Sequence, residues 1–286
     1  TKREAEKALA TAQHSVDRGS VVSKSVIKVD DFLDQWLASQ KGRLKASTHH
    51  SYVITSKRIR TGLGHAQLQA LTPLQVESFY ADLLDHGRAD GTGLSPKTVR
   101  NTHTVLRKAL SDAERLGLVQ RNAAAAARGP AVERPEFTVW SSDDLRQFFA
   151  TAKSNRLYAA YVLLATTGMR RGEVIGVRWK DIDLDSGQLA IVQTLTDVNG
   201  RLTMSTPKTT RSRRVIYIDD TTVAVLRQHR KRQREDQLAA GPDWAVTGDL
   251  AFTDEFGLPI RPEWFSKEFG RLVAASGVPR IRLHDV

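Results

Sequence analysis

Cysteine is absent from the 286 residues of the chain. This absence excludes disulfide bonds, thiolate metal sites and a cysteine nucleophile, and it fits a reducing compartment. No apolar stretch approaches the roughly 20 residues that a membrane-spanning helix needs, and no charged-then-apolar leader opens the chain. The eight histidines show no paired metal-ligand spacing, since His49 and His50 are adjacent rather than one helical turn apart. We therefore expect no membrane span, no signal for export and no metal site.

The charge of the chain is strongly positive. The formal net charge is +11 at pH 7, and the sequence pI is about 10.0. Such a surplus indicates a polyanionic partner, although it does not distinguish DNA from RNA or from an anionic membrane surface. The length of the chain allows two domains, each with its own core.

The hydrophobic pattern predicts an α+β protein that is mainly α-helical with a small antiparallel sheet. We expect an N-terminal helix and linker over residues 1–27, a helical domain over 28–121, a linker over 122–138 and a second domain over 139–286. The second linker combines an alanine run with Gly129, Pro130 and Pro135, which is typical of a flexible connector. The N-terminal helix is either the end of a preceding domain or a solvated helix.

Helices dominate the first domain, and their starts are well marked by Thr72 before Pro73 and by Ser95 before Pro96. Two helix starts also carry basic and hydroxyl side chains, which suit contacts to nucleic-acid phosphates. The helix near Lys97 ranks first as an element that could enter a major groove, and the helix near Lys45 ranks second. The alternative is an ordinary solvated helix face. The candidate nucleic-acid contacts in this domain are Lys45, Ser47, Thr48, Lys97, Thr98, Arg100, Asn101, Arg107 and Lys108.

In the second domain, a buried helix should end at Gly168, and the periodicity then changes to that of strands. Strands are expected over residues 189–195, 201–205 and 215–218, with a hairpin turn at Asn199-Gly200. The long basic helix over residues 221–237 is better explained as a solvated face than as a nuclear-localisation signal. Three tyrosines in apolar segments are predicted to be core residues: Tyr158, Tyr161 and Tyr217.

Three short motifs follow one another in the second domain. The first, Thr167-Gly168-Met169-Arg170-Arg171-Gly172-Glu173, places Arg170 after a glycine turn at the start of a helix, with Val174 and Val177 on its core face. An anion held by Arg170 would there meet free backbone N–H groups and the positive end of the helix dipole. The second motif, Pro207-Lys208-Thr209, should lie at the tip of the small sheet. The third, Leu283-His284-Asp285, stands near the end of the sequence. Each motif alone is compatible with ordinary surface residues.

Together, the order and spacing of these motifs resemble the tyrosine recombinases, the phage-integrase family of site-specific DNA recombinases. In that family a tyrosine attacks a DNA phosphodiester and leaves a 3′-phosphotyrosyl link. Because this link conserves the bond energy, the resemblance implies no cofactor, metal or ATP. It further implies that Arg170 clamps the scissile phosphate, that Lys208 donates a proton to the 5′ oxygen, and that His284 contacts the phosphate.

The resemblance assigns supporting roles as well. Glu173 would orient the arginine pocket, although a structural salt bridge explains this residue nearly as well. Arg171, Thr209 and Arg211 are implied DNA contacts beside the catalytic residues. The family's second arginine would follow directly after Val286, and its tyrosine nucleophile later still. We therefore expect the complete protein to cleave DNA and this chain at most to bind it.

For partners, the resemblance implies duplex DNA with inverted-repeat core sites, gripped by a clamp whose first half is a SAM-like core-binding domain. It also implies a homotetramer on synapsed DNA, possible accessory DNA-bending proteins, and a bacterial or phage-encoded cytoplasmic protein. Two alternatives stay open: a catalytically inert DNA-binding regulator on the same fold, and a relative of the type IB topoisomerases. The joint presence of Arg170, Lys208 and His284 favours a recombinase over a pure binder.

Overall fold

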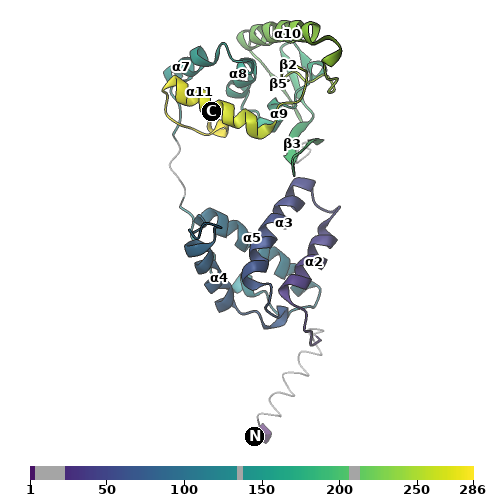
Figure 1. Ribbon diagram of the computed structural model, residues 1–286, viewed down its shortest axis with the longest axis vertical. Coiled ribbons are helices and arrows are strands. Elements are labelled where there is room, and N and C mark those ends of the chain that lie inside the picture. The colour runs from purple at the N-terminus through teal and green to yellow at the C-terminus, as the bar shows by residue number, and fades with distance from the viewer. Residues whose placement is uncertain (4–22, 134–137, 206–212) are drawn as a thin grey trace. The chain divides into compact units, whose positions relative to one another are not determined.

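A computed structural model describes residues 1–3, 23–133, 138–205 and 213–286 of the chain (Figure 1). It divides into two compact units, Thr1–Arg134 and Pro135–Val286, and each unit has its own hydrophobic core. Helices predominate, and the named strands of the described residues all belong to the second unit. The predicted class, mainly α with a small antiparallel component, is confirmed. The helix predicted at the N-terminus lies almost entirely outside the described residues.

The first unit is a helical bundle. Its elements are α2 (Val29–Gln40), α3 (Ala46–Leu63), η1 (Leu68–Ala70), α4 (Pro73–His86), α5 (Pro96–Arg115) and α6 (Ala123–Ala126). The helix starts follow the sequence signals: Thr72 and Gln75 form a capping box on α4, and the Ser95 side chain accepts from the Thr98 N–H at the start of α5. Helices α2 and α5 both pack on α3, so that α5 has one face in the core and one in solvent.

Residues 122–127 belong to this bundle and not to the linker in which they were predicted. Asn122 is buried, and its side-chain amide donates to the Arg107 carbonyl and to Ser111 Oγ, both at 2.8 Å. Its side-chain oxygen, Oδ1, caps α6 by accepting from the Ala125 N–H at 3.0 Å. Because the side chains of the alanine run are small, α6 can pack closely against α4 and α5. The division between the two units falls later, at Arg134 and Pro135.

The second unit combines helices with short strands. Its helices are α7 (Ser142–Ala152), α8 (Tyr158–Thr167), α9 (Arg171–Val174), η2 (Trp179–Asp181), α10 (Asp220–Ala240), η4 (Gly241–Asp243), α11 (Pro262–Ser276) and η5 (Leu283–Asp285). Aromatic side chains join α7, α8 and α11: Tyr161 stacks on Phe265 with ring centroids 4.8 Å apart, and Phe148 contacts Phe269 at 5.3 Å. This core fixes the end of α8 and the turn that follows it.

The strands form two small antiparallel sheets. They are β1 (Ile182–Asp183), β2 (Gln188–Ile191), β3 (Thr194–Val198), β4 (Arg201–Ser205) and β5 (Arg214–Tyr217), arranged as β1-β2-β5 and as the hairpin β3-β4. Asn199 and Gly200 form the predicted hairpin turn, with φ angles of 56° and 77°. The single strand predicted over residues 189–195 is wrong, because the chain changes sheets at residues 192–193. There the Gln193 amide donates to the Gly176 carbonyl at 2.8 Å.

Candidate functional site

The first motif begins where α8 ends. Gly168 has a φ of 61°, in the left-handed region that favours glycine, and its N–H donates to the Leu164 carbonyl at 3.1 Å. Met169 is buried and anchors the turn in the core. Arg170 follows directly, and 69% of its side chain is exposed. Arg170 thus follows a glycine turn, as the sequence predicted, and its side chain faces solvent.

The helix predicted after Arg170 is much shorter than expected. Helix α9 has four residues, and the Arg170 backbone N–H donates to Glu173 Oε2 at 2.9 Å. This N–H is therefore already satisfied, and one helical turn has little dipole of its own. The predicted helix is thus reduced to one turn, and the binding of an anion by Arg170 stays a prediction. Val174 and Val177 are buried as predicted, although Val177 lies beyond the helix.

Two glycines allow α9 to lie close to strand β3. A Cβ atom added to Gly172 would lie 2.5 Å from Thr194 Oγ1, and one added to Gly176 would lie 2.9 Å from the Leu195 N atom. Any larger side chain at these positions would push β3 away from α9. The packing of α9 between α8 and β3 fixes the position of Glu173.

Glu173 is the centre of the polar contacts at this site, and its side chain is 3% exposed. Its Oε1 accepts from Arg170 Nη1 at 3.1 Å, while Oε2 accepts from the Arg170 N–H at 2.9 Å and from Arg214 Nη2 at 3.1 Å. Burial by itself would raise the pKa of Glu173, but these hydrogen bonds outweigh it and lower that pKa. The carboxylate thus stays ionised and forms salt bridges to two guanidinium groups. Its role in orienting a catalytic arginine pocket stays a prediction.

Arg214 is a member of this site that the sequence did not indicate. It lies 41 residues beyond Glu173, in a run of basic residues any of which could have faced inward. The register of the sheet decides the matter, because Arg214 is the first residue of β5 and pairs with Ile191 of β2. Only the buried position of Glu173, which calls for a cationic partner, could have given a signal.

The second motif, which includes Lys208 and Thr209, lies outside the described residues, as does its neighbour Arg211. Lys208 was predicted at the tip of one small sheet. The described flanks differ from that prediction, because Ser205 ends the β3-β4 hairpin and Arg214 begins the edge strand of the other sheet. The described residues on the two sides of Lys208 thus belong to two different sheets.

The third motif forms the turn η5. Leu283 is buried in the core of the unit, and Arg282 Nε donates to Asp285 Oδ2 at 2.6 Å. These contacts hold the turn in place while His284 stays exposed. The hydrogen bonds and ion pairs of the described residues connect Arg170 with Glu173, but none of them reaches His284.

Arg171 differs from its neighbour Arg170. It is half-buried, and its Nη1 donates to Ser266 Oγ of α11 at 2.7 Å. This contact joins α9 to α11 within the unit and so gives Arg171 a structural role. Its contact with DNA stays a prediction.

The nucleic-acid contacts predicted on α5 share one face of the helix. Lys97, Arg100, Asn101, Arg107 and Lys108 are exposed, whereas the opposite face is buried. Some of their hydrogen bonds stay within the unit: Arg100 Nη1 donates to the Pro130 carbonyl at 3.2 Å, and Lys108 Nζ donates to Asp112 at 2.9 Å. At the other predicted helix start, Lys45 and Ser47 are exposed, and Thr48 is half-buried. Thr98 is half-buried, and its hydroxyl pairs with that of Ser95.

The tyrosines of the second unit differ in exposure. Tyr161 is buried and Tyr158 is half-buried. The prediction that Tyr217 is a core residue is wrong, because its side chain is 76% exposed. The reason is the position of β5 at the edge of its sheet, where Val215 and Tyr217 point to one exposed face. Apolar neighbours in the sequence therefore did not indicate burial here.

The basic face of α10 is mostly engaged with the same unit. Arg227 Nη2 donates to Asp185 at 2.8 Å, the Arg230 guanidinium lies 5.2 Å from the centroid of the Trp179 ring, and Arg232 donates to the Arg156 carbonyl. These contacts tie α10 to the three-stranded sheet and to the start of α8. The expected solvated face is therefore only partly solvated.

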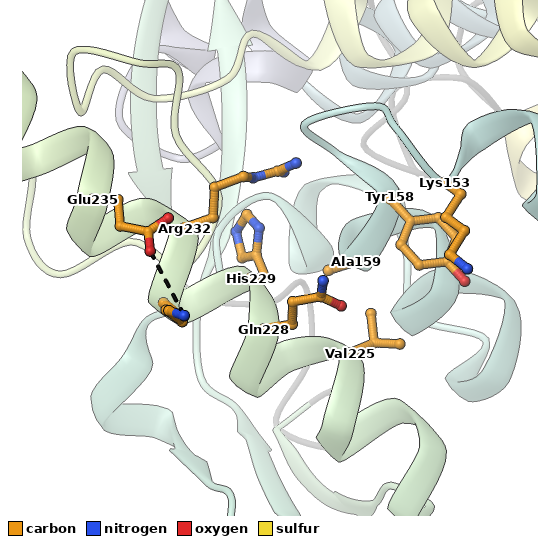
Figure 2. Close-up of a pocket in the computed structure, with 9 residues that line it drawn as sticks. Lys153, Tyr158, Ala159, Val225, Gln228, His229, Arg232 and Glu235 are labelled. Atoms are coloured by element: carbon orange, nitrogen blue, oxygen red, sulfur yellow. Dashed lines mark ion pairs between the residues drawn. The ribbon is translucent and has the colours of Figure 1, made fainter.

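A hollow of about 300 Å³ lies between α10 and the start of α8 (Figure 2). It is lined by Lys153, Tyr158, Ala159, Val225, Gln228, His229, Lys231, Arg232 and Glu235, and so by none of the predicted site residues. Burial lowers the pKa of His229 to about 4, and its Nε2 pairs with the Ala251 carbonyl at 2.8 Å. His229 is therefore a neutral core histidine, and this hollow is separate from the Arg170 site.

Within residues 1–3, 23–133, 138–205 and 213–286, no group of three or more histidine, aspartate or glutamate side chains is arranged to hold a metal ion. No helix in these ranges is long and apolar enough to cross a membrane.

Comparison with protein families gives two matches. Residues 139–286, more than half of the chain, match the model described as "Phage integrase family". Residues 28–84 match "Phage integrase, N-terminal SAM-like domain".

Known proteins give a consistent result. The chain is 25% identical to a "Tyrosine recombinase XerC-like" protein of Caldanaerobacter subterraneus, over all of this chain and 77% of that protein. It is also 25% identical to the "ICEBs1 integrase" of Bacillus subtilis, over 83% of this chain and 62% of that protein. It thus spans less than two thirds of the second relative.

Solved structures share the fold. An integrase of the Tn1549 transposon in complex with transposon right end DNA aligns with a TM-score of 0.71 and 18% identity, over 88% of this chain and 83% of that chain. A lambda integrase tetramer bound to a Holliday junction aligns with a TM-score of 0.63 and 20% identity, over 93% of this chain and 68% of that one.

Proposed function

Because the chain belongs to the phage integrase family, we propose that it contains the DNA-binding and catalytic domains of a site-specific tyrosine recombinase. One observation carries this proposal: the family's first motif presents an exposed Arg170 that is held by the buried carboxylate of Glu173. An ordinary surface arginine needs no such support, whereas an arginine that binds a reacting phosphate must point in a fixed direction.

The proposed reaction breaks and rejoins a phosphodiester. The tyrosine hydroxyl gives up its proton to solvent or a nearby base, and its oxygen forms a bond to phosphorus. The bond from phosphorus to the 5′ oxygen breaks, and a proton from Lys208 passes to the departing oxygen. Attack of a 5′ hydroxyl on the phosphotyrosine reverses these steps and rejoins the strand. Negative charge builds up on the non-bridging oxygens, and the guanidinium of Arg170 stabilises it through paired N–H donors. His284, exposed on η5, is assigned to the same phosphate.

The nucleophile is proposed to come from outside residues 1–286. Within the second unit, Tyr161 is buried and its hydroxyl faces the Phe265 carbonyl at 3.4 Å, so it cannot reach a DNA strand without unfolding the core. Burial thus excludes Tyr161 but not the exposed Tyr217. We propose that residues 1–286 bind duplex DNA without cleaving it.

DNA binding is assigned to both units, as a clamp on inverted-repeat core sites. The first unit contributes the exposed cations of α5, and the second unit contributes the residues around Arg170. The lambda integrase that aligns with this chain is a tetramer on a Holliday junction. By this likeness we propose that four complete copies of the recombinase synapse two DNA sites, with or without DNA-bending proteins.

Covalent trapping tests the proposed function. The full-length protein is mixed with nicked candidate site DNA, which prevents religation, and a denaturing gel reports protein that stays attached to DNA. We expect a shifted band, and Arg170→Ala should reduce its rate of formation on the order of 10²–10³-fold while largely sparing binding. Binding without any covalent band, at a site that the protein recognises, would instead support an inert DNA-binding regulator. Equal losses of binding and cleavage would contradict the assignment of Arg170 to catalysis.

A further inference from the structure

Arg214 belongs to none of the three motifs that carry the proposed function, yet it contacts Glu173, the residue that holds Arg170. Its Nη2 atom lies 3.1 Å from Glu173 Oε2, and its side chain is 31% exposed. The same Oε2 atom accepts the Arg170 backbone N–H at 2.9 Å, whereas Oε1 accepts from Arg170 Nη1 at 3.1 Å. The two oxygens of one buried carboxylate are thus divided between two arginines.

This division determines which way Arg170 can point. A buried carboxylate attracts a guanidinium most strongly when both oxygens are paired with the two-pronged edge of one arginine. Here Arg214 and the Arg170 backbone occupy Oε2, so the guanidinium of Arg170 is held at Oε1 through Nη1. An arginine has five N–H donors, and this side chain is 69% exposed. Donors beyond Nη1 are therefore left for an external anion.

Arg214 is itself well placed to serve as a fixed support. It is the first residue of β5 and pairs with Ile191, whose side chain is buried in the core of the unit. A displacement of Arg214 would shift the positions of both Glu173 and Arg170, because the two arginines donate to the same carboxylate.

We propose that Arg214 is a positioning residue, which occupies one oxygen of Glu173 and thereby keeps the guanidinium of Arg170 turned toward the scissile phosphate. It does not touch the reacting atoms. Without it, Arg170 would fold back onto both oxygens of Glu173 and lose part of its hold on the phosphate. The inference rests on the proposed recombinase function.

The test is single-turnover cleavage of nicked site DNA by the full-length protein, with DNA binding measured in parallel. Arg214→Ala should slow cleavage about 10- to 100-fold, the range typical of residues that orient a functional group from behind, with DNA affinity nearly unchanged. Arg214→Lys, which retains the charge but not the planar fork, should recover part of the rate. Arg156→Ala is the matched control, because Arg156 is 27% exposed and pairs with Asp236 in the same unit, away from Glu173. It should cleave at the wild-type rate.

A substrate with a neutral methylphosphonate at the scissile position separates positioning from general damage. This group lacks the charged non-bridging oxygen that Arg170 neutralises, so Arg214→Ala should slow its cleavage much less than that of the normal phosphodiester. In addition, Arg170→Ala combined with Arg214→Ala should cleave no more slowly than Arg170→Ala alone. A loss of fold in Arg214→Ala would show as a lowered melting temperature, and Arg214→Lys then supplies the comparison of the two substrates.

The outcomes separate the inference from the proposed function. If the wild-type protein cleaves DNA, three results would each overturn the positioning role alone. Arg214→Ala could cleave at the wild-type rate, or it could slow the cleavage of both substrates equally. The third result is that the rate losses of Arg170→Ala and Arg214→Ala add up in the double variant. No covalent product from wild type or from Arg156→Ala would overturn the proposed function, and this inference with it.

Discussion

The exposed cations of α5 and the exposed Arg170 are held in different ways. Lys97 and Arg107 extend from the surface of a 20-residue helix whose opposite face is buried. Arg170, by contrast, is fixed at its backbone N–H and at its guanidinium by the same buried carboxylate. Attraction to a DNA backbone tolerates freely moving charges, whereas stabilising one reacting phosphate requires a fixed direction. The difference separates a surface suited to binding from a site suited to catalysis.

The largest effect is expected from replacing Glu173, because its carboxylate fixes Arg170. Glu173→Gln should slow cleavage about 10- to 100-fold, because a neutral amide holds the two guanidinium groups weakly. It should also lower the free energy of unfolding by about 1–3 kcal/mol at neutral pH. Covalent trapping and urea unfolding measure the two effects. Wild-type cleavage by this variant would contradict the role given to the carboxylate.

The pH dependence of that stability difference follows from the pKa of Glu173, which lies below its ordinary value of 4.5 in the folded state. The unfolded state therefore binds more protons in this range. The stabilisation is complete above the ordinary value and is lost as the pH falls through the lower, folded value. The gap in unfolding free energy between wild type and Glu173→Gln should therefore shrink as the pH falls below the ordinary value of 4.5. A gap that stays constant would show that folding does not lower the pKa of Glu173.

The exposed cations of α5 should affect DNA affinity and its salt dependence, not the rate of cleavage. Replacing Lys97 and Arg107 with alanine should weaken DNA binding and reduce the slope of log affinity against log salt by about 0.9 for each phosphate that is no longer neutralised. Cleavage of DNA that is already bound should hardly change. Filter binding at several salt concentrations measures the slope. An unchanged slope would mean that this face of α5 does not bind phosphates.

Much of this arrangement could be predicted from local sequence signals. The caps at Thr72 and Ser95, the left-handed turn at Gly168 and the solvated face of α5 depend on residues within one or two turns of each other. The length of α9 and the pairing of Arg214 with Glu173 could not, because contacts between distant parts of the chain decide them. The strand break at residues 192–193 has the same cause, since α9 and the β3-β4 hairpin pack together there.

Replacing Asn122 tests whether residues 122–127 belong to the first unit. The expected effect is on stability and not on cleavage. Its side chain makes three hydrogen bonds in a buried position, so Asn122→Ala should cost about 1–3 kcal/mol. Asn101→Ala, on the exposed face of α5, should stay within about 0.5 kcal/mol of wild type. Thermal unfolding of the two variants gives the comparison. Equal stabilities would return residues 122–127 to the linker.

The smallest expected effect belongs to Tyr217, which combines exposure with a position close to the site. Its side chain is 76% exposed on β5, three residues after Arg214, so exposure does not exclude it as a nucleophile. The family motif places the nucleophile elsewhere, and Tyr217→Phe should therefore form the covalent DNA adduct at the wild-type rate. Its stability should change by less than about 0.5 kcal/mol, as is usual for an exposed position. Complete loss of the adduct in the full-length Tyr217→Phe protein, with DNA binding intact, would identify Tyr217 as the attacking residue. The exposed edge of β5 would then belong to the catalytic site.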